Sequence, residues 1–193
     1  EAANALLKFL EEPSTPLVAI LTTTNIEKCL PTIVSRCVTV KVNPLLFKEV
    51  IKGNEDRFSR EQAYALSLFA PTFKEMETLS RSDDFINAFQ VSETFISDLV
   101  SSLEKAGFGL LKEGSGLLKT QNSIKYFATI LIKVFSNVLS SNYSDSFSTF
   151  AISVKPYKDS LPKTIDVLAD ILNTLPANMN TTLSLARIIN SLK

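Results

Sequence analysis

The sequence has 193 residues, which is enough for one medium-sized domain or two small ones. It carries 20 Lys and Arg residues against 20 Asp and Glu residues, and this zero formal net charge argues against a stand-alone nucleic-acid binder. It contains no histidine, which excludes Ser-His-Asp triads, Cys-His pairs and histidine-bearing zinc sites within this sequence.

The apolar pattern gives no sign of a membrane segment, because no apolar run approaches the roughly 20 residues that a spanning helix needs. Cys29 and Cys37 are too few for a disulfide framework and too far apart for a usual metal-binding pair. We therefore expect a cytoplasmic protein with no membrane contact and no bound metal. Because residues 1–10 resemble the middle of a helix and the first residue is not Met, we also expect the sequence to be part of a longer chain.

The first part of the sequence is typical of the end of an α/β domain. Helical spacing of apolar residues predicts a helix over residues 2–11, which Pro13 would end. The apolar run Leu17–Leu21 predicts a strand buried on both faces. The polar residues Thr22–Asn25 follow it directly, and the alternating residues Val38–Val42 predict a second strand with one wetter face.

After Asn43 and Pro44 the pattern changes to helices joined by loops. The helical segments predicted from apolar spacing and capping residues are 44–52, 60–70, 71–79, 82–103, 124–139, 161–175 and 181–192. Four of the five glycines lie between Gly107 and Gly116 and predict a mobile connection. The serine-rich segment 142–160 predicts a long loop with room for one ordered turn.

Two blocks of sequence carry a family resemblance. Residues Glu1–Pro13 read E-A-A-N-A-L-L-K-F-L-E-E-P, and residues Leu30–Cys37 read L-P-T-I-V-S-R-C. The first block is similar to the N-A-L-L-K-x-L-E-E-P segment of bacterial clamp-loader subunits of the AAA+ class. The second is similar to the L-P-T-I-x-S-R-C element of the same subunits, and the two blocks occur in the family's order and spacing.

This resemblance implies a mainly α fold with three parts. Residues 1–42 would be the C-terminal piece of an AAA+ α/β core, residues 43–81 a small helical lid, and residues 82–193 an all-α collar domain that holds subunits together. The two blocks cover only residues 1–44, and the helices predicted after Pro44 suit both the lid and the collar.

Within the family, the sequence resembles the δ′ type of DNA polymerase III subunit more than the ATPase type, γ/τ. The wording Lys8-Phe9-Leu10 is similar to δ′ subunits, and the last helix with its lead-in, 178–192, resembles their C-termini loosely. The ATPase type carries a nucleotide-sensing arginine in its lid helix, whereas the comparable stretch here, Phe69–Met76, has none. A γ/τ-type ATPase remains the alternative, as does a purely structural helical scaffold without a role in replication.

The resemblance assigns the most specific role to Arg36, with Ser35 and Cys37 as its motif neighbours. In the family, the arginine of the S-R-C element enters the ATP site of the adjacent subunit as a trans arginine finger. A planar guanidinium suits this role because it is always charged and pairs with phosphate oxygens. Without the flanking motifs, Arg36 would be interpreted as a surface arginine at the end of a helical turn.

A second candidate site lies at the polar exit of the first predicted strand. Ligands of open α/β sheets bind at the carboxyl ends of strands, where a hydroxyl or amide can sense a phosphate. The resemblance implies a sensor-1-like position here, at Thr24, with Thr23 and Asn25 beside it. The alternative is a strand that ends in a simple polar turn.

The resemblance also implies cofactors and partners. This chain would bind no cofactor itself, while neighbouring subunits would hold ATP and Mg²⁺. The partners would be the γ/τ and δ clamp-loader subunits, the β sliding clamp and, through the complex, primed DNA. An orphaned parallel strand exposes apolar surface, so the isolated chain is expected to dimerise artefactually.

Two further groups of residues have both a plain and a functional interpretation. Tyr126, Phe127 and Phe135 lie at helical spacing and are interpreted as core residues rather than a base-stacking platform. The basic residues of the second group are interpreted as a solvated surface rather than a phosphate-binding patch. They are Lys155, Lys158 and Lys163.

Overall fold

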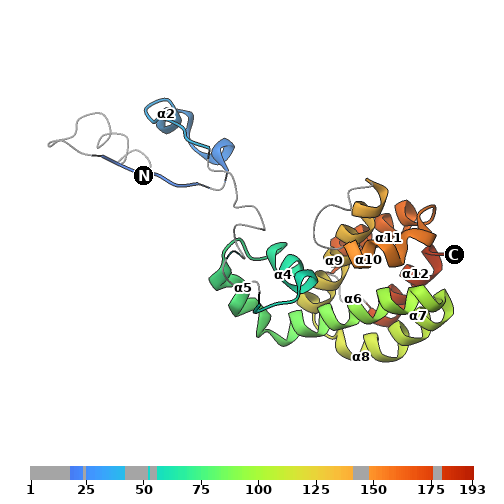
Figure 1. Ribbon diagram of the computed structural model, residues 1–193. Coiled ribbons are helices and arrows are strands. Elements are labelled where there is room, and N and C mark those ends of the chain that lie inside the picture. Colours follow the sequence, from blue (N-terminus) through green and yellow to red (C-terminus); the bar gives the residue numbers. More distant parts are fainter. Residues whose placement is uncertain (1–17, 24, 42–51, 53–55, 141–147, 176–179) are drawn as a thin grey trace. The chain divides into compact units, whose positions relative to one another are not determined.

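The computed structural model describes residues 18–23, 25–41, 52, 56–140, 148–175 and 180–193. The chain divides into two units, Glu1–Pro44 and Leu45–Lys193, and each is described by itself (Figure 1). The described residues are mainly helical, which confirms the predicted fold class. None of the described helices is both long and apolar enough to cross a membrane.

The first unit has two short helices among its described residues. They are the 3-10 helix η1, Ile26–Lys28, and the single-turn α-helix α2, Pro31–Val34. The predicted helix over residues 2–11 lies outside the described residues.

The two strands predicted in this unit are wrong for the residues that the structure describes. Residues 18–23 and 38–41 belong to no strand. A strand needs a hydrogen-bonding neighbour, and parallel strands are usually covered on both faces. Here Val18 and Val38, two of the described residues that suggested a sheet, are 89% and 92% exposed rather than buried.

Two helices open the described part of the second unit: α4, Arg60–Ser67, and α5, Phe73–Ser80. Ser59 caps α4, because its hydroxyl accepts a hydrogen bond from the Gln62 N–H at 3.1 Å. A capping box formed by Thr72 and Glu75 starts α5. Both helices are shorter than predicted, and the helix expected over 44–52 falls almost entirely outside the described residues.

The two longest described helices are α6, Asp83–Ser101, and α9, Gln121–Leu139, and both were predicted. Ser82 precedes α6 without a side-chain capping bond, and acidic residues occupy the first turn, where the positive end of the helix dipole favours them. The Thr120 hydroxyl, which caps α9, donates a hydrogen bond to Asp84 Oδ1 at 2.7 Å. This bond ties the starts of the two helices together.

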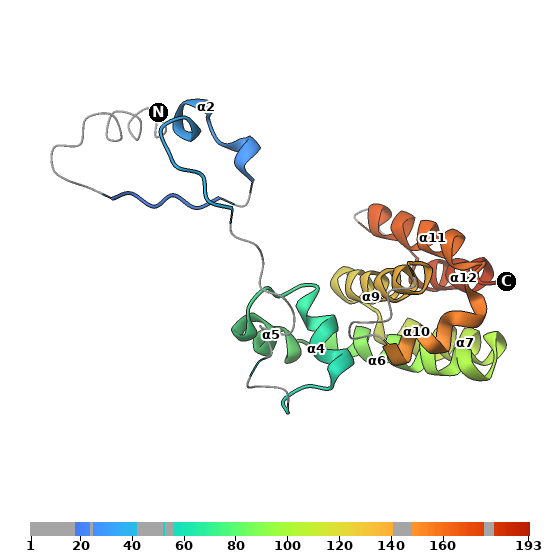
Figure 2. The same ribbon diagram turned by 45° about the horizontal axis from the view of Figure 1, so that its top comes forward.

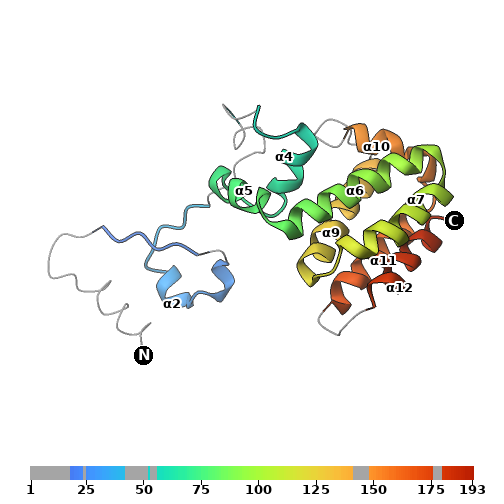
Figure 3. The same cartoon turned by 90° about the horizontal axis from the view of Figure 1, so that it is seen from below.

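The glycine-rich segment is helical, so the predicted mobile connection is wrong. It forms α7, Leu103–Gly109, then the π-helical turn η2, Leu110–Gly114, then the short α8, Ser115–Leu117. These elements run back along α6 (Figure 3). A Cβ at Gly107 would lie 3.1 Å from Ile189 Cγ2, and one at Gly114 would lie 3.2 Å from Val91 Cγ1. These glycines therefore permit close helix packing.

The serine-rich segment also contains more structure than predicted. It forms α10, Ser148–Val154, and the 3-10 helix η3, Lys155–Tyr157. Phe150, Ala151 and Val154 are buried and give α10 an apolar face, although the segment around the helix is rich in serine. The Tyr157 hydroxyl donates a hydrogen bond to the Leu99 carbonyl at 3.0 Å, which fixes η3 against α6.

Helices α11, Leu161–Thr174, and α12, Thr181–Ser191, complete the bundle and were predicted. Helix α9 is central: it packs against α6 and α10 and also against α11 (Figure 2). Between α11 and α12, the buried Ser191 hydroxyl donates to Thr164 Oγ1 at 3.0 Å. No buried side-chain polar atom among the described residues lacks a hydrogen-bond partner.

The predicted lid region packs on the predicted collar through aromatic side chains. The ring of Phe69, just after α4, lies 6.4 Å from that of Phe85 in α6 and 4.8 Å from that of Tyr126 in α9. Phe127 and Phe135 are fully buried, which agrees with their interpretation as core residues. The described residues from α4 to α12 therefore share one hydrophobic core.

Candidate functional site

The single turn α2 sets the backbone of the S-R-C element. Pro31 occupies its first turn, where the fixed φ of proline suits the start of a helix. Proline lacks an N–H, but an N–H at this position would have no acceptor within the helix, so no hydrogen bond is lost. The turn closes on itself through three successive N–H groups. Ser35 N–H bonds the Pro31 carbonyl at 2.9 Å, Arg36 N–H the Ile33 carbonyl at 3.1 Å, and Cys37 N–H the Val34 carbonyl at 3.2 Å.

The side chain of Arg36 is exposed and bends back toward its own turn. Its Nη1 donates a hydrogen bond to the Thr32 carbonyl oxygen at 2.9 Å. A cation is favourable at this position, because the last carbonyls of a helix carry the negative end of its dipole. The guanidinium is thus at the surface of the unit and accessible to a group from outside it.

The two motif neighbours of Arg36 differ in their surroundings. The exposed Ser35 donates a hydrogen bond from its hydroxyl to the Thr32 carbonyl at 3.1 Å. Cys37 is half-buried, and both Cys37 and Cys29 are free thiols. Among the described residues, no group of three or more Cys, Asp or Glu side chains could hold a metal ion.

The predicted sensor site is described only in part, because Thr24 lies outside the described residues. Thr23 Oγ1 donates to the Asn25 carbonyl at 3.0 Å and accepts from the Asn25 N–H at 3.2 Å. Asn25 Oδ1 in turn accepts from the Glu27 N–H at 2.9 Å and caps η1. These hydrogen bonds of Thr23 and Asn25 are those of a polar turn that starts a helix.

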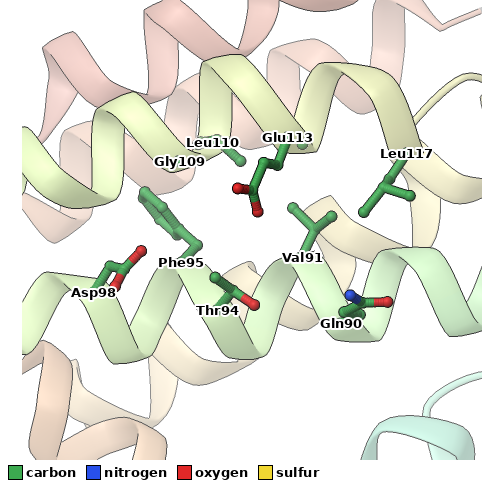
Figure 4. A pocket seen from close by; sticks show the side chains of 10 residues that line it. Gln90, Val91, Thr94, Phe95, Asp98, Gly109, Leu110, Glu113 and Leu117 are labelled. Atoms are coloured by element: carbon green, nitrogen blue, oxygen red, sulfur yellow. The ribbon is translucent and has the colours of Figure 1, made fainter.

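A small pocket lies between α6 and the segment formed by α7 and η2 (Figure 4). Its interior of about 20 Å³ holds about one water molecule, which excludes a nucleotide. The side chains that line it include Thr94 and Asp98 from α6 and Glu113 from η2. The glycine cluster was the sequence feature beneath this pocket, and it was interpreted as a mobile connection rather than as a site.

The basic residues after α10 do not form a distinct site. Lys155, Lys158 and Lys163 are all exposed. Asp159 and Asp166 are exposed close to them in sequence, so the region carries both signs of charge. A solvated surface remains the interpretation of these lysines.

Comparisons with known proteins match part of the chain. Residues 1–46 match the sequence family described as "DNA polymerase III, delta subunit". A protein of Bacillus subtilis (strain 168), DNA polymerase III subunit delta′, is 40% identical over 89 residues, which are 44% of this chain and 26% of that protein. No solved structure matches this chain.

A second relative carries the name of another subunit. DNA polymerase III subunit gamma of Buchnera aphidicola subsp. Schizaphis graminum (strain Sg) is 39% identical over 74 residues, which are 35% of this chain and 20% of that protein. The chain thus spans about a quarter or less of the length of these curated relatives. The resemblance read from the two sequence blocks is confirmed for this part of the chain.

Proposed function

We propose that this chain, whose residues 1–46 match the family described as "DNA polymerase III, delta subunit", is part of a δ′-type clamp-loader subunit. In this proposal the subunit assists the ATP-driven loading of the β sliding clamp on primed DNA. The observation that carries the proposal is an exposed arginine, Arg36, at the end of a closed helical turn inside the segment that matches the family.

Arg36 acts in this proposal as an arginine finger supplied in trans. Hydrolysis of ATP spreads negative charge over the γ-phosphate oxygens, and a guanidinium held beside them stabilises that charge by a factor of roughly 10³–10⁵ in rate. An arginine finger must lie at the surface, its backbone must be well ordered, and its guanidinium must be able to extend to the neighbouring subunit. The exposure of Arg36 supports the first condition, and the backbone hydrogen bonds that close α2 support the second.

The chain itself binds no cofactor in this proposal, and the adjacent subunit holds ATP and Mg²⁺. The proposal follows from the lid stretch Phe69–Met76, which has no arginine where the ATPase type carries a nucleotide-sensing one. The partners are the γ/τ and δ subunits, the β clamp and, through the complex, DNA, all in the cytoplasm. The helical unit would serve as lid and collar and hold the assembly together.

The test replaces Arg36 by Ala in the full-length subunit that carries this sequence. We expect the clamp loader to assemble normally and its DNA-stimulated ATPase rate to fall, because one ATP site loses its stabilising charge. Arg60→Ala is the matched control, because it removes an exposed arginine from the start of α4. ATPase activity that is the same for Arg36→Ala, Arg60→Ala and the unaltered complex would refute the proposal.

A γ/τ-type ATPase subunit is the second candidate, and the Buchnera gamma subunit is the observation that favours it. The two candidates differ in whether the intact subunit binds nucleotide by itself. Equilibrium binding of a fluorescent ATP analogue to the purified full-length subunit separates them: tight, Mg²⁺-dependent binding indicates the ATPase type, and its absence indicates δ′.

A further inference from the structure

The Thr32 carbonyl oxygen accepts hydrogen bonds from two side chains that follow it. Arg36 Nη1 lies 2.9 Å from this oxygen, and Ser35 Oγ lies 3.1 Å from it. A backbone carbonyl has two lone pairs, so it can accept both bonds at once. Ser35 and Arg36 therefore share one acceptor at the C-terminal end of α2.

A finger that reaches a phosphate must first leave the Thr32 oxygen. The guanidinium of Arg36 lies on its own turn in this structure, four residues after the carbonyl that accepts its bond. Docking against a neighbouring subunit excludes water, and a carbonyl without a donor then costs free energy. This free-energy cost is small only if another group donates a hydrogen bond to the Thr32 oxygen after Arg36 has left it.

We propose that Ser35 is a positioning residue for Arg36, acting through the Thr32 carbonyl; this inference rests on the proposed trans role of Arg36. The Ser35 hydroxyl keeps its bond to Thr32 when the guanidinium leaves. The Thr32 carbonyl keeps a hydrogen-bond donor and the turn stays closed. The backbone of Arg36 therefore keeps the position from which its side chain extends.

The shortness of α2 is the reason that one hydroxyl matters. The helix has four residues, and a single turn is marginal in isolation because nucleation is costly. Leu30, at its N-terminal end, makes no side-chain capping bond. The Ser35 hydroxyl thus supplies a side-chain bond to a turn that has none at its other end. Because Ser35 is exposed, replacing it by Ala leaves no cavity in a core.

The experiment compares Ser35→Ala and Ser35→Thr in the full-length subunit, within the assembled complex. For Ser35→Ala we expect the DNA-stimulated kcat of the site served by Arg36 to fall about two- to ten-fold, the value of one hydrogen bond, with an unchanged KM for ATP. Ser35→Thr keeps the hydroxyl and is expected to restore the rate. Addition of Ser35→Ala to Arg36→Ala should lower the rate no further, because Ser35 acts only through Arg36.

Several results would overturn the inference. An unchanged kcat for Ser35→Ala, beside a reduced kcat for Arg36→Ala, would remove the role of Ser35 and leave the proposed function standing. A further fall in the double variant, or weaker assembly of Ser35→Ala alone, would show a general structural role instead. An unchanged rate for Arg36→Ala would overturn both proposals together.

Discussion

Two glycines decide how closely α7 and η2 approach their neighbours at the scale of single residues. A Cβ at Gly107 would lie 3.1 Å from Ile189 Cγ2, closer than side chains usually approach, while a Cβ at Gly116 would meet nothing within 4 Å. The two positions can therefore be compared. Adding a side chain should lower the free energy of unfolding at Gly107 and raise it at Gly116.

We expect Gly107→Val to lower the free energy of unfolding by about 1–3 kcal/mol, because the added side chain overpacks the contact with α12. Gly116→Ala should raise it by about 0.5–1 kcal/mol, because alanine loses less conformational freedom in a helix than glycine. Urea unfolding followed by circular dichroism measures both. Equal stabilities of Gly107→Val and the unaltered chain would show that this segment is the mobile connection the glycines first suggested.

The candidate site was chosen from the sequence and stays a prediction, whereas its local geometry comes from the structure alone. The block Leu30–Cys37 indicated Arg36 because two motifs occur at family spacing. The bond from Arg36 to the Thr32 carbonyl depends on which rotamer the side chain adopts, and residue patterns do not encode that. The position of Thr24 stays a prediction, because that residue lies outside those that the structure describes.

At the scale of elements, the helices with a strong apolar period were predicted correctly. The loops predicted from glycine-rich and serine-rich composition were wrong, because both segments contain helices. Helices α6, α9, α11 and α12 have apolar stripes long enough to show their period. Helix α10 has only seven residues, so its apolar face is too short to show a helical period within a serine-rich segment. One strand was predicted from an apolar run and the other from alternation of apolar and polar residues, and the described residues show no strand pairing for either.

Helix α10 gives the prediction that belongs to this scale. Phe150 is 7% exposed and its ring lies 6.5 Å from that of Phe89, while Ile152 is 68% exposed. We expect Phe150→Ala to lower the free energy of unfolding by about 3–5 kcal/mol, because it empties a core position, and Ile152→Ala to change it by less than about 0.5 kcal/mol. Thermal or urea unfolding of both variants measures the difference. Equal effects would mean that α10 does not pack on α6 and α9 as the structure has it.

At the scale of the whole molecule, the first unit carries apolar residues that its described parts do not cover. Val18, Ile20, Val38 and Val40 are between 75% and 92% exposed. Exposed apolar segments in extended chain promote association with other chains.

We therefore expect the isolated 193-residue chain to self-associate and a variant starting at Leu45, which keeps the second unit, to stay monomeric. Light scattering coupled to gel filtration, at several concentrations, reports the mass of each. A double substitution, Val18→Lys with Val38→Lys, should weaken the association of the whole chain. A monomer at all concentrations for the unaltered chain would contradict this expectation.

The central claim is that the charge of Arg36 stabilises hydrolysis at an ATP site belonging to another subunit. Single-turnover hydrolysis of labelled ATP in the assembled, DNA-bound complex tests it most directly, because it separates the chemical step from nucleotide binding. With Arg36→Ala we predict unchanged ATP affinity and a rate at that one site lower by a factor of roughly 10³ or more. A rate at every site equal to that of the unaltered complex would contradict the account.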